Sequence, residues 1–416
     1  MGNDRETRLA PGWDVAGVKD NGRQIDMAKL RGYRLARLQT ELRRLDCGAA
    51  LLTDPMNIRY ATGSRNMQVW TAHTPARACF VPAEGRCILW DFYNCAFLSE
   101  GLETIAEVRP ARGFYFFTAG SRVAERARAW AAEIADVVAE HCGGTRRLAV
   151  DRLDPPGTHA LEAHQITILD GQEPCETARA VKSEEEIASM VQAIAACEAG
   201  MARMHAALRP GISENELWAE LHATNIRLGG EWIETRLLSS GERTNPWFQE
   251  CGERIIRPGD LVSFDTDLIG PFGYCADISR SFFCGPGRPS DAQRRLYGLA
   301  LEQVHYNIDA LMRPGLDLRE AADLAWPIPE EFRPNRYSCV AHGVGLCDEW
   351  PRIAHRQGGE GVHYDGVLLP GMVMCVESYI GAVGGREGVK LEQQVLVTET
   401  GPRLLSTFPF EEALVA

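Results

Sequence analysis

Apolar positions in the first 150 residues alternate between helical spacing and short continuous runs. Helical spacing predicts an amphipathic helix over Leu30–Leu45 and a long, alanine-rich helix over Arg122–His141. The short apolar runs predict strands at Ala49–Leu52, Cys87–Trp90 and Leu148–Val150. Helices that alternate with strands in this way are typical of a small α/β domain.

The second half of the chain follows a different pattern, after a predicted break near Gly171–Ala180. Three capping boxes, each a serine followed three residues later by Glu or Gln, predict helix starts at Ser183 with Glu186, Ser213 with Glu216, and Ser290 with Gln293. The first of these helices should end at about Leu208. Extended segments lie between the helices, at Leu261–Ile269, Ser279–Phe283, Met372–Glu377 and Val389–Val397. We therefore expect an α+β domain with a curved antiparallel sheet whose concave face collects polar side chains.

Length and composition fit a globular protein of two domains. The chain has 416 residues, of which 45% are hydrophobic and 24% charged, and domains typically hold roughly 100 to 200 residues. A net charge of −13 argues against nucleic acid or an anionic membrane as a partner, because such surfaces require clustered Lys and Arg. The polar start, Met1–Asp26, contains no apolar signal segment, so we expect a cytoplasmic protein.

The cysteines give the same indication of compartment. There are 13 of them, scattered without CxxC pairs. This distribution predicts buried, reduced thiols rather than a disulfide framework. It also argues against a zinc finger, which needs closely spaced cysteine pairs.

Two aspartates, Asp265 and Asp267, interrupt an apolar run. On a continuous strand the period of two would place both carboxylates on one face. Buried carboxylates need Arg or Lys partners, a shared proton or a metal ion, because unpaired buried charge is costly. A loop or a surface strand would explain this pair equally well if it stood alone.

Other residues favour the metal. Asp277 follows shortly after the pair, His342 begins a His-Gly-Val-Gly segment, and Glu377 and Glu392 each interrupt a strand-like apolar run. Carboxylates with one imidazole suit Mn, Fe, Co or Zn held by bridging carboxylates. We therefore predict a binuclear divalent metal site formed by Asp265, Asp267, Asp277, His342, Glu377 and Glu392.

The order of these residues resembles the pita-bread metallopeptidase-like family, which includes methionine aminopeptidases, prolidases, Xaa-Pro aminopeptidases and the metal-free creatinase. The family order Asp, Asp, His, Glu, Glu matches Asp277, His342, Glu377 and Glu392, with either Asp265 or Asp267 as the first aspartate. The segment 57–60, Asn-Ile-Arg-Tyr, is similar to creatinase and prolidase N-terminal domains. The resemblance implies an N-terminal arm over 1–26, a creatinase-like α/β domain over 27–178 and a pita-bread catalytic domain over 179–416.

The chain departs from the peptidases at positions that matter for amide cleavage. Asp348 stands in the place of the histidine that follows the ligand histidine, and Trp247 stands where the family has another histidine. Ser378 follows Glu377, where peptidases usually have proline. An ionised carboxylate can only accept protons or bind cations, so it does not replace an imidazole. We expect the metal chemistry to be retained and the amide chemistry to be lost.

Several segments resemble the dimethylsulfoniopropionate lyases of marine bacteria, a branch of the same family, namely 56–62, 66–70, 229–236, 244–252 and 342–351. This resemblance implies an iron-dependent homodimer, with Mn, Zn or Co as other possible metals, that acts on a small molecule by β-elimination. It also implies that Asp348 is the base and that Trp70 and Tyr337 bind the sulfonium group through their aromatic faces. The alternatives are an Xaa-Pro peptidase-like hydrolase, a lyase for another small substrate and a non-enzymatic binding module.

Overall fold

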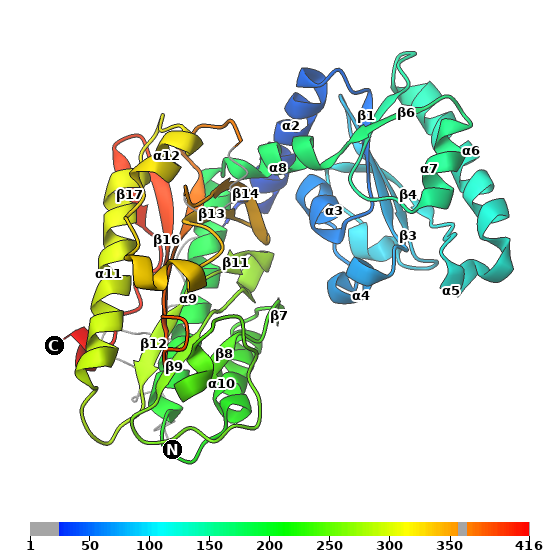
Figure 1. Ribbon diagram of the computed structural model, residues 1–416. Helices are drawn as coiled ribbons and strands as arrows, with labels where there is room; N and C mark the ends of the chain where they lie inside the picture. The colour runs from blue at the N-terminus through cyan, green and yellow to red at the C-terminus, as the bar shows by residue number, and fades with distance from the viewer. Residues whose placement is uncertain (1–24, 357–363, 416) are drawn as a thin grey trace. The chain divides into compact units, whose positions relative to one another are not determined.

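The structure is a computed structural model that describes residues 25–356 and 364–415. Most of the predicted N-terminal arm, residues 1–26, therefore lies outside the described residues. Contacts within the chain divide it into an N-terminal unit, Asp26–Arg179, and a C-terminal unit that holds the chain from Ala180 onward (Figure 1).

The N-terminal unit is built on a six-stranded mixed sheet of order β4-β3-β2-β1-β5-β6. Figure 1 shows α6 and α7 on one side of this sheet and α2 and α3 on the other. Its strands are β1 (Ala49–Leu52), β2 (Ala78–Pro82), β3 (Cys87–Asp91), β4 (Ile105–Pro110), β5 (Arg147–Val150) and β6 (Thr167–Asp170). Its helices are α2 (Met27–Arg44), α3 (Pro55–Thr62), α4 (Gln68–His73), α5 (Phe116–Ala119), α6 (Val123–His141), α7 (Pro155–Glu162) and α8 (Gln172–Ala180).

Local sequence explains where these helices begin and which face they bury. The carboxylate of Asp26 accepts hydrogen bonds from the first backbone N–H groups of α2, and Asp54 does the same for α3. On α6, Trp130 and Ile134 recur at helical spacing and pack into the core with Leu51 of β1. Burial of this apolar stripe attaches the helix to the sheet.

The C-terminal unit contains a five-stranded antiparallel sheet of order β14-β13-β15-β16-β17 and two smaller sheets, β12-β9-β8 and β11-β10-β7. The strands of the large sheet are β13 (Ala341–Val344), β14 (Asp348–Ile353), β15 (Val373–Ile380), β16 (Val389–Thr398) and β17 (Gly401–Leu404). The shorter strands are β7 (Trp232–Ile233), β8 (Leu238–Ser240), β9 (Leu261–Phe264), β10 (Leu268–Ile269), β11 (Cys275–Ala276) and β12 (Arg280–Phe283). The helices are α9 (Glu184–Ala207), α10 (Glu214–Arg227), α11 (Asp291–Leu311), α12 (Leu318–Leu324) and α13 (Glu412–Val415).

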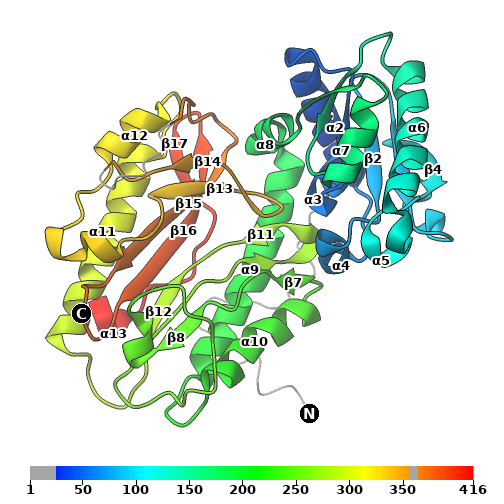
Figure 2. The same cartoon turned by 45° about the vertical axis from the view of Figure 1, so that its right-hand side comes forward.

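The large sheet uses its two faces for different purposes. Val376 of β15 and Leu391 of β16 belong to the same buried apolar cluster as Val304 of α11, and Figure 2 shows α11 lying along these strands. Because side chains alternate along a strand, Glu377 and Glu392 project from the opposite face. The strand register that buries Val376 and Leu391 therefore also places the two predicted ligands, Glu377 and Glu392, together on the opposite face.

Most elements predicted from the pattern are confirmed, including the three capping boxes at Ser183, Ser213 and Ser290. The predicted break near Gly171–Ala180 agrees with the division of the chain between Arg179 and Ala180, although the helix α8 covers Gln172–Ala180. One expectation is wrong. Leu261–Ile269 is not one strand, because the chain turns between β9 and β10.

The cysteine prediction is also confirmed. The 13 cysteines all lie among the described residues and none forms a disulfide, and all except Cys95 and Cys347 are buried. No helix in the described ranges is long and apolar enough to cross a membrane.

The capping box at α9 provides a test of local stabilisation. The Ser183 hydroxyl accepts a hydrogen bond from the Glu186 N–H at 3.3 Å, and the Glu186 carboxylate accepts one from the Ser183 N–H at 2.9 Å. Ser183→Ala should destabilise the protein by about 1 kcal/mol because it removes one acceptor. Thermal unfolding followed by circular dichroism should show a lower midpoint for Ser183→Ala. Ser183→Asp, which keeps an acceptor, should unfold like the wild type; equal midpoints for all three proteins would contradict the prediction.

Candidate metal centre

Three strands of the large sheet contribute the first part of the site. Glu377 of β15 lies directly opposite Glu392 of β16 in the antiparallel register, and His342 of β13 lies opposite Cys375 of β15. All four side chains are buried. Like charges placed directly opposite each other on neighbouring strands repel, so this arrangement favours a cation or a shared proton between the two glutamates.

A turn, rather than a strand, supplies the aspartate pair. β9 ends at Phe264, and Asp267 has a φ of 35°, which is uncommon for a residue other than glycine. The turn nevertheless brings Asp265 and Asp267 together with Asp277, which follows β11, so that their ligand oxygens lie within 4.8 Å of one another. The Thr235 hydroxyl donates to Asp267 at 2.7 Å and holds that carboxylate.

The structure brings all six predicted ligand residues into one cluster. Three overlapping groups have ligand atoms within 4.8 Å of one another: Asp277, His342, Cys375 and Glu392; Asp265, Glu377 and Glu392; and Asp265, Asp267 and Asp277. Sequence reasoning did not include Cys375. Because it lies two residues before Glu377 on a strand, its place on the same face could have been predicted.

The imidazole of His342 is oriented as in known metal sites. Its Nδ1 lies 3.1 Å from the carbonyl oxygen of Gly343, so this nitrogen is the donor, and the neutral form of the imidazole would carry its lone pair on Nε2. Nε2 faces Glu377 Oε1 at 3.3 Å and Asp277 Oδ2 at 3.5 Å.

Buried oxygen atoms next to this imidazole show that the residues fit a metal. Among the described residues, Asp277 Oδ1, Glu377 Oε1 and Glu392 Oε1 are buried and have no hydrogen-bond partner. Such atoms are costly unless a cation or a donor satisfies them. Carboxylate oxygens around one imidazole form a donor set suited to a divalent transition metal.

A lysine that sequence reasoning did not include lies inside the cluster. Lys390 is fully buried, and its Nζ lies 2.6 Å from Glu377 Oε2, 3.0 Å from Asp265 Oδ2 and 3.3 Å from Glu392 Oε2. It occurs two residues before Glu392 on β16, so the period of two places both side chains on one face. That spacing was the available signal.

Burial and neighbouring charges shift the pKa values of the carboxylates in the cluster in opposite directions. Burial raises the pKa of Asp277 well above its ordinary value, and the negative charges of Glu392 and Asp265 raise it further. For Asp265, burial also opposes ionisation, but the ammonium of Lys390 and several hydrogen bonds outweigh it and lower the pKa to about 2. Lys390 therefore compensates only part of the negative charge in the cluster.

Asp348 lies at the start of β14, at the edge of the cluster. Its Oδ1 is 3.8 Å from His342 Nδ1, and its side chain is 61% exposed. Partial loss of hydration raises the pKa of Asp348, whereas the nearby His342 lowers it. The side chain of Asp348 is therefore accessible to water among the described residues.

Aromatic residues lie beside the cluster within the same unit. The Nζ of Lys390 is 4.4 Å from the ring centroid of Tyr337 and 5.8 Å from that of Trp247. The ring of Phe248 stacks on Tyr337 with a centroid distance of 5.4 Å. Trp70 belongs to the N-terminal unit, where its ring lies 5.4 Å from that of Phe92. The substrate-binding roles of Tyr337 and Trp70 remain predictions.

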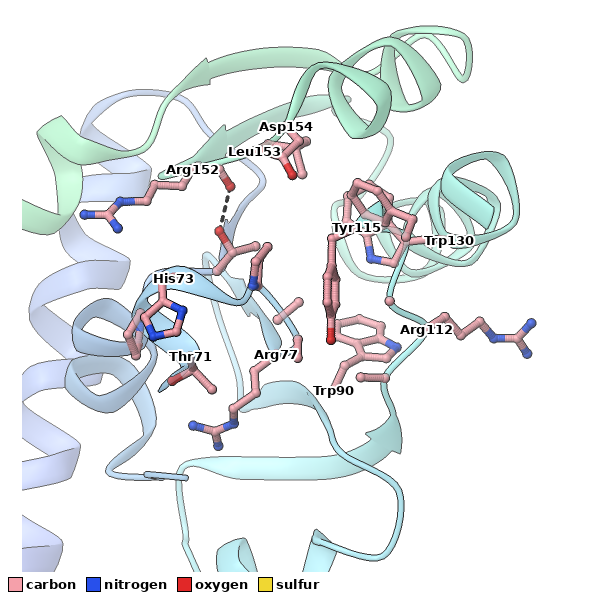
Figure 3. A pocket seen from close by; sticks show the side chains of 18 of the residues that line it. Thr71, His73, Arg77, Trp90, Arg112, Tyr115, Trp130, Arg152, Leu153 and Asp154 are labelled. Atoms are coloured by element: carbon pink, nitrogen blue, oxygen red, sulfur yellow. Dashed lines mark hydrogen bonds between the residues drawn. The ribbon is translucent and has the colours of Figure 1, made fainter. Parts of the chain in front are cut away.

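A separate cavity of about 250 Å³ lies in the N-terminal unit (Figure 3). Trp90, Trp130 and Tyr115 form much of its wall. The arginines at its rim already have acidic partners, since Arg112 lies 3.2 Å from Glu133 and Arg152 lies 3.0 Å from Asp54. None of the predicted site residues is among the described residues that line it.

Comparison with known proteins agrees with this geometry. Residues 188–399 match Metallopeptidase family M24, and residues 34–181 match the Creatinase/Prolidase N-terminal domain. This chain belongs to metallopeptidase family M24. The predicted fold class, a creatinase-like α/β domain followed by a pita-bread domain, is confirmed for this M24 protein.

Two curated relatives cover nearly the whole chain. The dimethylsulfoniopropionate lyase DddP of Roseovarius nubinhibens is 44% identical, over 98% of this chain and 92% of the relative. The protein of the same name from Roseobacter denitrificans is 41% identical, over 94% of this chain and 88% of the relative. The solved structure of an Xaa-Pro dipeptidase from Bacillus anthracis has a TM-score of 0.74 at 23% identity and covers 92% of this chain and 99% of its own. That structure shows a shared fold.

Replacing one shared ligand should remove metal. Asp277 appears in two of the three candidate groups, so Asp277→Asn should bind clearly less metal than the wild type after reconstitution and desalting. Elemental analysis by mass spectrometry measures this directly. Asp365→Asn, on a side chain that is 89% exposed, is the matched control and should retain the full metal content. Equal metal content in Asp277→Asn and the wild type would contradict the predicted site.

Proposed function

We propose that this M24 protein is a metal-dependent lyase that cleaves dimethylsulfoniopropionate to dimethyl sulfide and acrylate. The observation that carries the proposal is the 44% identity to a dimethylsulfoniopropionate lyase over 98% of this chain. The site supports it, because Asp348 and Trp247 stand where peptidases of the family have histidines. All the residues predicted as metal ligands, in contrast, are present.

The charges of the cluster fit two divalent ions. The five carboxylates of the predicted ligands, Asp265, Asp267, Asp277, Glu377 and Glu392, carry five negative charges when ionised, and Lys390 cancels one. The four that remain equal the charge of two divalent cations. We propose iron as the metal, with Mn, Zn or Co as alternatives that suit the same donors. When bound, the ions would supply Lewis acidity toward the carboxylate of the substrate.

The proposed reaction requires a base near the substrate carboxylate. Asp348 would take the proton from the carbon next to that carboxylate, and the electron pair of the broken C–H bond would form the new C=C bond. The C–S bond then breaks, and its electron pair leaves with sulfur as neutral dimethyl sulfide. Asp348 is suited to this task because its carboxylate is close to the cluster and remains 61% exposed, so the proton can pass to water.

The sulfonium group calls for aromatic contacts. Tyr337 already has the buried ammonium of Lys390 at 4.4 Å from its ring centroid, which is the geometry of a cation–π contact. We propose that Tyr337 and Trp70 present aromatic faces to the sulfonium, each good contact being worth roughly 0.5 to 2 kcal/mol.

The direct test is the release of dimethyl sulfide. Protein reconstituted with Fe, Mn, Co or Zn is incubated with dimethylsulfoniopropionate, and the headspace is assayed by gas chromatography. We expect release with at least one metal and none with the metal-free protein. No release under any metal, together with cleavage of proline dipeptides, would replace the lyase with an Xaa-Pro peptidase-like hydrolase of the same fold.

The role of Asp348 has its own test. Asp348→Ala should abolish dimethyl sulfide release, because alanine cannot accept the proton from the substrate. The metal content should stay at the wild-type level. Asp365→Ala, on an exposed side chain of the same unit, is the control and should keep both properties. Loss of metal together with activity in Asp348→Ala would make Asp348 a ligand or a structural residue instead of the base.

Two further features belong to this proposal. We propose a homodimer, as the resemblance to the lyases implies, and light scattering after size exclusion would show the mass of two chains. A reducing compartment such as the cytoplasm suits 13 cysteines that form no disulfide.

A further inference from the structure

Lys390 is a buried cation among residues that otherwise form a metal site. Its side chain has no exposed surface, and it lies on β16 two residues before Glu392. A buried ammonium is costly unless anions and acceptors surround it. Here its anionic partners come from three separate segments: Asp265 after β9, Glu377 on β15 and Glu392 on β16.

The two glutamates divide their oxygen atoms between Lys390 and His342. The Oε2 atoms of Glu377 and Glu392 lie 2.6 and 3.3 Å from Lys390 Nζ. Their Oε1 atoms lie 3.3 and 3.9 Å from His342 Nε2 and have no hydrogen-bond partner in the described part of the chain. Each carboxylate is thus held at one oxygen, and its other oxygen lies on the side of the imidazole.

The ammonium is itself held in a definite place. The hydroxyl of Ser279 lies 2.6 Å from Lys390 Nζ, 2.8 Å from Asp265 Oδ1 and 2.7 Å from Glu392 Oε2. The ammonium also lies over the ring faces of Tyr337 and Trp247, with its Nζ 4.4 and 5.8 Å from the two ring centroids. These contacts fix the nitrogen through hydrogen bonds and through attraction between the cation and the rings.

We propose that Lys390 is a positioning residue that assembles the metal ligands before any metal binds. Without a cation, Glu377 and Glu392 would repel each other, because they are direct partners on antiparallel strands. The ammonium holds them and Asp265 together and leaves the Oε1 atoms in place beside His342. This inference rests on the metal dependence of the proposed function and is independent of the substrate.

The test compares Lys390→Met with the wild type by cobalt binding. Met has a similar shape without the charge, so the ligands should lose their fixed geometry. Isothermal titration of the metal-free proteins with Co²⁺ should give an affinity lower by about 10- to 100-fold, the usual effect of removing a partner of metal ligands. The visible absorption spectrum of the cobalt-loaded variant should also change, because d–d bands report coordination geometry. Lys390→Arg, which keeps the charge, should recover most of the affinity.

A matched control separates this role from the general cost of removing a buried lysine. Lys182 is also buried, and its Nζ lies 3.0 Å from the single carboxylate of Glu349. Lys182→Met should lower the unfolding temperature but keep the wild-type cobalt affinity and spectrum. The same result in Lys390→Met, or tighter binding, would overturn the proposal.

A further measurement covers the case in which Lys390→Met does not fold. A crystal structure of the metal-free wild type should show Lys390 in contact with Asp265, Glu377 and Glu392, and ligand carboxylates turned away from one another would overturn the proposal. Neither measurement uses dimethylsulfoniopropionate, so failure of the lyase assay leaves this inference unaffected.

Discussion

The structure of the C-terminal unit depends on how it accommodates concentrated negative charge in a buried place. Four carboxylates of the cluster are buried and largely removed from water, namely those of Asp265, Asp277, Glu377 and Glu392. Isolated charges in such an environment are strongly unfavourable, and fixed cations compensate them only when the geometry is good. Lys390 and the metal implied by the family are therefore central to the site. The sheet, its register and its covering helix keep the anionic and cationic groups at the required separations.

The register of β15 and β16 links the apolar core to the site. One face of these strands carries Val376 and Leu391, which pack in the cluster that includes α11. The other face carries Glu377, Lys390 and Glu392, which converge on the cluster. A slip of one residue would move the carboxylates into the core and expose the apolar side chains. The energy of apolar burial thus fixes the positions of the charged groups.

The M24 relatives show how one fold can support different reactions. The solved Xaa-Pro dipeptidase shares the fold at 23% identity, while the relatives at 44% and 41% identity are dimethylsulfoniopropionate lyases. Fold alone does not decide between these chemistries, because function depends on the residues of the site. In this chain all the predicted ligand residues are present, whereas the resemblance predicts that Asp348 and Trp247 stand where peptidases have histidines.

The sequence by itself determined the features that depend on neighbouring residues. The capping boxes at Ser183, Ser213 and Ser290 could be predicted because each is complete within four residues. The ligand residues could be named because charged groups inside apolar runs are conspicuous, and the order Asp, Asp, His, Glu, Glu resembles one family. Only the tertiary structure decided how these residues meet. The left-handed turn at Asp267 depends on contacts that hold it, such as the one from Thr235. The contact of Lys390 with Asp265 joins residues that are distant in sequence, and no local pattern encodes such a pair. Local hydrogen bonds are determined within a few residues, whereas the partner of a buried charge is determined by the folding of the whole unit.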